Sequence, residues 1–140
     1  MTFKRKVLLF AAIILGYSII VLSLSKVFLY DYSKFGLGSF FIYMVAGYVG
    51  AYRKGFWFGV LLAAITGFID STVGWYMTQL INPFYAGIVL PPLSIKVALD
   101  VVLSITGCAA LMGLIGASAC KIFRRTKPLI PNNSFNPTPR

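Results

Sequence analysis

Residues 56–81 form a 26-residue, mostly apolar run, which limits the folds open to this chain. A helix rises about 1.5 Å per residue, so this run can cross the roughly 30 Å hydrocarbon core of a bilayer. Similar runs cover about residues 7–25, 37–52 and 95–123. Only 11% of the residues are charged, too few to cover the surface of a soluble domain. The sequence therefore predicts an all-α membrane protein with four transmembrane helices.

The basic residues indicate how these helices are oriented. Ten of the 13 Lys and Arg residues lie near the N-terminus, in the Arg53-Lys54-Gly55 turn, or from Lys121 at the end of the fourth run onward. The other three, on the opposite side, are Lys26, Lys34 and Lys96. Because cytoplasmic loops carry the excess of Lys and Arg, we expect an antiparallel bundle with both termini in the cytoplasm. The short loops and the charge bias favour a bacterial inner membrane.

The two ends of the chain allow separate predictions. Residues 126–140 contain four prolines and few apolar side chains, which predicts a disordered cytoplasmic tail after a transmembrane domain of residues 1–125. Basic residues before the first run and Ser23-Leu24-Ser25 after it are also typical of a signal peptide. The apolar core is slightly long for that, so we expect an uncleaved first helix, and the intact mass would distinguish the two.

Asp70 lies near the middle of the third run, where a carboxylate is costly unless it has a partner, a proton or a function. On a helical wheel it shares a face with small residues, while bulky side chains lie opposite. We therefore expect Asp70 to face other helices rather than lipid. Its preferred partner is Tyr43, because side chains on the second and third runs lean toward each other. Thr66 and Ser104 are alternative partners, and Ser104 is expected at a similar depth.

The fourth run carries two faces that could pack against helices. Asp100 shares one face with Ser104, and Lys96 precedes Asp100 by one turn. Lys96 can reach the headgroups or pair with Asp100, so we favour a structural role for Asp100 over transport. The nearly opposite face carries small residues that include Ala109 and Gly113. A helix with two such faces lies at the centre of a bundle or is shared with another subunit.

Two hypotheses for the function follow. In the first, a small integral membrane protein acts through helix–helix contacts as an oligomer or an accessory subunit, and Asp70 is hydrogen-bonded between helices. The alternative is a small proton-coupled carrier or channel centred on Asp70, because a carboxylate shielded from water can exchange a proton near neutral pH. The sequence leaves both open and specifies no substrate.

We do not expect an enzyme. The sequence has no His and only three acidic residues, so it lacks the groups that general acid–base and nucleophilic catalysis need. Cys108 and Cys120 match no metal-ligand spacing, and neither a metal nor a cofactor is predicted. The net charge of +10 does not predict nucleic-acid binding, because the basic residues lie at the ends of apolar runs. The expected partners are the lipid bilayer and further copies or subunits in the membrane.

Overall fold

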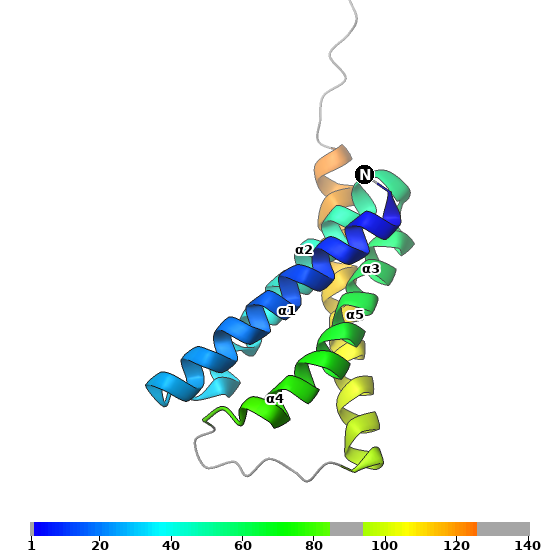
Figure 1. Ribbon diagram of the computed structural model, residues 1–140. Helices are drawn as coiled ribbons and strands as arrows, with labels where there is room; N and C mark the ends of the chain where they lie inside the picture. The colour runs from blue at the N-terminus through cyan, green and yellow to red at the C-terminus, as the bar shows by residue number, and fades with distance from the viewer. Residues whose placement is uncertain (1, 85–93, 126–140) are drawn as a thin grey trace, which may run out of the picture.

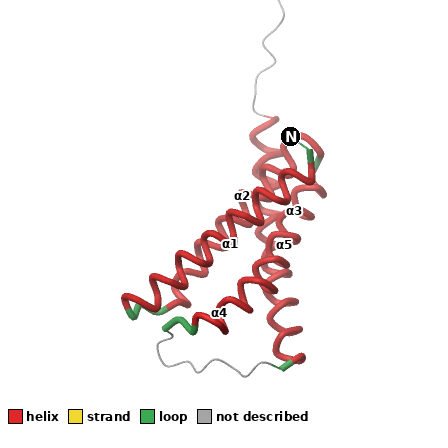
Figure 2. Tube along the Cα trace, in the orientation of Figure 1, coloured by secondary structure: helices red, strands yellow, loops and turns green. Residues whose placement is uncertain are grey.

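A computed structural model describes residues 2–84 and 94–125, which form helices with short connections between them (Figures 1 and 2). The described part contains no strand. Helix α1 covers Phe3–Phe28 and is followed by a short 3-10 helix, η1, at Tyr32–Phe35. Helix α2 then covers Gly36–Lys54. The third span comprises α3 (Phe56–Ile69), a π-helical segment η2 (Asp70–Gly74) and α4 (Trp75–Ile81), and the last helix is α5 (Ile95–Arg125).

Four helical stretches are long and apolar enough to cross a membrane, which confirms the four predicted spans at the level of length and composition. The second stretch, Tyr32–Tyr52, has 21 residues and is longer than the predicted run 37–52, because η1 leads directly into α2. The start of α1 and the end of α5 lie at the same end of the molecule (Figure 1). The predicted tail, residues 126–140, lies outside the described residues.

The core is formed by α2, α3 and α5, which pack closely against one another. Glycines at the crossing points allow the backbones to approach. A Cβ atom added to Gly47 on α2 would lie 2.5 Å from the carbonyl oxygen of Gly113 on α5. A Cβ atom on Gly116 would collide with the carbonyl oxygen of Met44. Close contact of this kind provides the van der Waals packing that drives helix association in membranes.

Helix α1 lies beside this core and contacts α2, α3, η2 and α4; among the described residues it does not contact α5. Its buried side chains recur every third or fourth residue, as expected for one helix face: Lys6, Phe10, Ile14, Ser18, Val21, Leu22 and Ser25. The Lys6 ammonium donates a hydrogen bond to the carbonyl of Val49 on α2. Near the other end, the Lys26 ammonium donates to the carbonyl of Ile81 at the end of α4, at 2.8 Å.

The third span bends at η2 (Figure 1). Helix α3 packs along α5, whereas α4 turns toward the C-terminal end of α1 and, within the described residues, makes no contact with α5. A π-helical turn disturbs the regular hydrogen-bond ladder of an α-helix and is a known cause of such bends. The sequence predicts one apolar run over residues 56–81 and gives no sign of this change in direction.

Candidate polar site at Asp70

Asp70 is the first residue of η2, where the third span changes direction. Two hydroxyl groups from other spans donate hydrogen bonds to its carboxylate. The hydroxyl of Ser18 on α1 donates to Oδ1 at 2.9 Å. The hydroxyl of Tyr43 on α2 donates to Oδ2. The carboxylate therefore connects the first three spans at one point.

Both donors are shielded from solvent. The side chain of Tyr43 is 1% exposed and that of Ser18 is 2% exposed. A buried hydroxyl costs free energy unless it is hydrogen-bonded, and a hydrogen bond to an ionised carboxylate is stronger than one between neutral groups. Gly74, one turn after Asp70, keeps space for the carboxylate, because a Cβ atom at residue 74 would lie 2.7 Å from Oδ1.

Further polar groups lie near this carboxylate. The side chain of Ser39, one turn earlier on α2, lies close to Tyr43. The side chain of Tyr32, in η1, lies close to Thr78 on α4. A cavity of about 200 Å³ lies beside these groups and is lined by Tyr17, Val21, Tyr32, Ser33, Phe35, Gly36 and Ser39. Polar side chains thus continue from Asp70 through Tyr43 and Ser39 to the wall of a cavity near the start of α2.

The structure contains the predicted hydrogen bond between Tyr43 and Asp70 and does not bring the two alternative partners to the carboxylate. The Thr66 hydroxyl donates to the carbonyl of Leu62 in its own helix at 2.8 Å, a common use of threonine within a helix. Ser104 is exposed, because α5 turns the opposite face toward α2 and α3. In the structure, the alternative partner Ser104 therefore faces away from Asp70.

Ser18 and the π-helical segment η2 were not predicted from the sequence. The short turn between the second and third spans indicates which two helices are neighbours, but no such turn fixes how α1 crosses them. One signal was available: Ser18 lies at helical spacing between Ile14 and Leu22, on the face that α1 buries. A polar residue on the buried stripe of an apolar helix points to a polar partner on a neighbouring helix.

The other polar group singled out in the sequence lies on α5. Lys96, Asp100 and Ser104 are exposed. Five further residues of α5 are also exposed: Gly107, Cys108, Leu111, Ile115 and Ser118. These five and Asp100 lie within about 60° of Ser104 on the helix circumference, whereas Lys96 lies farther round. We call the set from Asp100 to Ser118 the outer face of α5. The opposite face, with Ala109 and Gly113, is buried against α2 and α3.

No three His, Cys, Asp or Glu side chains within residues 2–84 and 94–125 lie close enough together to hold a metal ion. The comparisons with known proteins give no family, because no family model, no curated protein and no solved structure matches this chain.

Proposed function

We propose that this is a small integral membrane protein that acts through helix–helix contacts, as an oligomer or as a subunit of a larger membrane complex. The observation that carries the proposal is the outer face of α5, where five of the seven residues are polar or small although the face is exposed in the single chain; the other two are Leu111 and Ile115. Lipid-facing surfaces favour bulky apolar side chains, whereas interfaces between membrane helices favour Gly, Ser and other small residues. This face has the composition of an interface.

The proposed orientation has an antiparallel arrangement of the spans with both termini in the cytoplasm. It rests on the excess of Lys and Arg near the N-terminus, in the α2–α3 turn and at the end of α5. The position of the start of α1 and the end of α5 at one end of the molecule supports it (Figure 1). The same charge bias supports assignment to the inner membrane of a bacterium.

A second copy of the chain is the partner that we favour for the outer face. Lys96 and Asp100 carry opposite charges one turn apart and are both exposed. In a parallel two-fold pair of α5 helices, Lys96 of one copy can meet Asp100 of the other, and the reciprocal contact forms by symmetry. An Asp in the membrane that gains such a partner is much less costly than one that faces lipid.

A pair of glycine substitutions tests this proposal. An added Cβ atom meets nothing within 4 Å at either Gly107, on the outer face, or Gly16, on α1, so a side chain can leave the backbone at both positions without a collision. We expect Gly107→Leu to abolish the oligomer and Gly16→Leu to leave it intact, with the mass measured by light scattering in detergent. A purified wild-type protein that is monomeric in both detergent and lipid nanodiscs would contradict self-association. An oligomer that Gly107→Leu leaves unchanged would exclude this face.

The second candidate function, a proton-coupled carrier or channel, is favoured by one specific observation. The carboxylate of Asp70 lies at a π-helical segment, and polar groups extend from it toward a cavity near the start of α2. Single π-helical turns occur frequently at functional sites. In proteoliposomes this function requires pH-dependent flux that Asp70→Asn abolishes while the protein still assembles. Wild-type vesicles without any proton flux would exclude it.

A further inference from the structure

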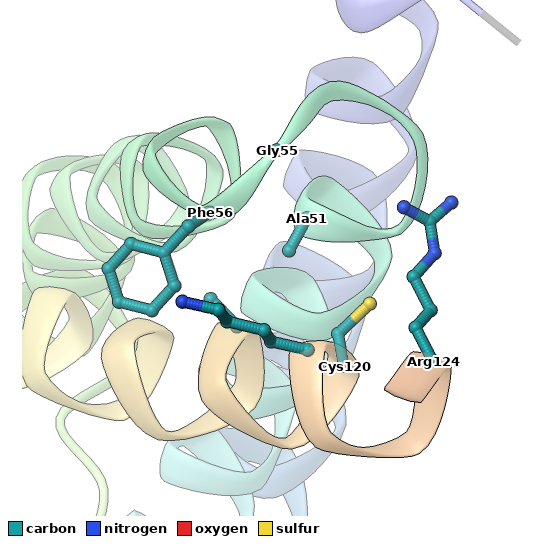
Figure 3. A pocket seen from close by; sticks show the side chains of 7 residues that line it. Ala51, Gly55, Phe56, Cys120 and Arg124 are labelled. Carbon is teal, nitrogen blue, oxygen red and sulfur yellow. The ribbon is translucent and has the colours of Figure 1, made fainter. Parts of the chain in front are cut away.

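A cavity of about 350 Å³ lies between the α2–α3 turn and the C-terminal end of α5 (Figure 3). Its lining residues combine apolar groups with two basic side chains: Ala51, Gly55, Phe56, Ala117, Cys120, Lys121 and Arg124. The cavity is remote from the polar site, because Asp70 is 14 residues, or about 21 Å, along the third span from Phe56. It also lies away from the outer face of α5, since Ala117 and Cys120 are buried.

The basic side chains of the lining are exposed, whereas its two alanines are buried. Ala51 lies between the ring of Phe56 on one side and the side chain of Arg124 on the other (Figure 3). The guanidinium of Arg124 lies 4.9 Å from the centroid of the Tyr52 ring on α2, a cation–π contact that holds it beside the cavity. Lys121 is exposed one turn earlier on α5. The cavity therefore has an apolar floor and a positively charged rim.

No acidic side chain of this chain can neutralise that rim. The only acidic residues in the sequence are Asp31, Asp70 and Asp100. Asp100 precedes Lys121 by 21 residues on the same helix, a separation of about 32 Å. Asp31 follows the far end of α1, and Asp70 is hydrogen-bonded near the middle of the third span. The first turn of α3, which has no side-chain cap, directs the positive end of its helix dipole toward the same region.

We propose that this cavity binds the phosphate headgroup of an anionic phospholipid. Lys121 and Arg124 contact the phosphate, and an acyl chain lies along Phe56 and the two alanines. The cavity lies at the ends of three membrane-spanning helices, beside the exposed Trp57 and Phe58, and aromatic residues of this kind gather at headgroup depth. Basic pockets between transmembrane helices are known to bind such headgroups. The apolar floor favours a lipid over free phosphate.

Lipid titrations followed by native mass spectrometry test the proposal on the full-length protein. The probes are phosphatidylglycerol, phosphatidylcholine and inorganic phosphate. The test variant carries Lys121→Gln and Arg124→Gln, and the control carries Lys4→Gln and Arg5→Gln, an equal loss of charge at two exposed residues near the N-terminus. A third variant, Lys121→Arg with Arg124→Lys, keeps both charges.

We expect wild-type protein to retain phosphatidylglycerol in preference to phosphatidylcholine. Each basic group near the membrane surface raises the affinity for an anionic lipid about 5-fold, so the double Gln variant should bind phosphatidylglycerol roughly 25-fold more weakly. The control and the charge-preserving variant should bind within about 3-fold of wild type. Equal loss of affinity in the test and control variants would overturn the proposal, because it would indicate a general charge effect. Inorganic phosphate that binds as tightly as the lipid would overturn the identification of the ligand.

Discussion

The hydrogen bond between Tyr43 and Asp70 makes a quantitative prediction, because the substitution Tyr43→Phe removes only the donating hydroxyl. Hydrogen bonds between membrane helices contribute about 0.6 kcal/mol on average and up to about 1.7 kcal/mol. The donor of this bond is only 1% exposed, so little water competes for it and its value should lie at the upper end. We expect Tyr43→Phe to lower the free energy of unfolding by about 1–2 kcal/mol.

A double-mutant cycle isolates this contact. In an Asp70→Ala background the hydroxyl of Tyr43 has lost its acceptor, so adding Tyr43→Phe should cost almost nothing, which gives a coupling energy of about 1–2 kcal/mol. Unfolding by SDS in mixed micelles, followed by the fluorescence of Trp57 and Trp75, measures each free energy. Trp75 is a suitable probe because it directly follows η2.

Tyr48→Phe provides the matched control for the cycle. It makes the same chemical change on the same helix, where the ring of Tyr48 stacks on Tyr52 with a centroid separation of 6.5 Å. Its coupling to Asp70→Ala should stay within about 0.3–0.5 kcal/mol, as expected for independent sites. If Tyr43→Phe costs the same free energy with and without the Asp70 carboxylate, the hydroxyl contributes through some other contact and the predicted hydrogen-bond energy is refuted.

Three other substitutions have outcomes that follow from close contacts. Gly116→Leu should destabilise the protein by about 1–3 kcal/mol or prevent its folding, because the new side chain collides with the backbone at Met44. Unfolding in SDS measures this change. A variant as stable as wild type would disprove that α2 and α5 approach so closely. Gly74→Ala should cost about 1–3 kcal/mol in the same assay through overlap with the Asp70 carboxylate, and a neutral result would show that the carboxylate points elsewhere. Ser18→Ala should cost about 0.6–2 kcal/mol, and an unchanged stability would mean that α1 is not tied to Asp70.

Much of the fold could be predicted because the bilayer restricts the choices. A membrane span needs about 20 apolar residues with all backbone groups paired internally, so apolar runs translate directly into helices. Helix α3 begins at Phe56, as the third apolar run predicts. Gly55 ends α2 there because its φ of 98° is not helical. The end of α4 agrees because Asn82, with φ of 50°, leaves the helical conformation. Local signals of this kind are visible in a sequence.

The geometry within the bundle depends on packing and is less visible. The tight turn makes the second and third spans neighbours, and the opposing lean of their side chains brings Tyr43 and Asp70 to a similar depth, so this contact can be predicted. The contact from Ser18 depends on how α1 crosses α2 and α3, and nothing in the linker that follows α1 fixes that crossing. The rotation of α5 decides whether Ser104 or Ala109 faces the core. Both faces contain small residues, and only close backbone contacts such as that of Gly47 with Gly113 distinguish them.

Cross-linking through Cys108 tests most directly whether the outer face of α5 contacts a second copy. Cys108 is exposed on that face and Cys120 is buried, so Cys120→Ala leaves one informative thiol. A disulfide requires Cα atoms within about 7 Å, which limits cross-linking to chains that meet at this face. The control is a single cysteine at Ile13, an exposed residue of α1, in a chain that lacks both natural cysteines.

After oxidation in native membranes, we expect a disulfide-linked dimer through Cys108 and none through the thiol of the Ile13→Cys control. A Cys108 dimer no more abundant than that of the control would contradict the claim that two copies meet at the outer face of α5.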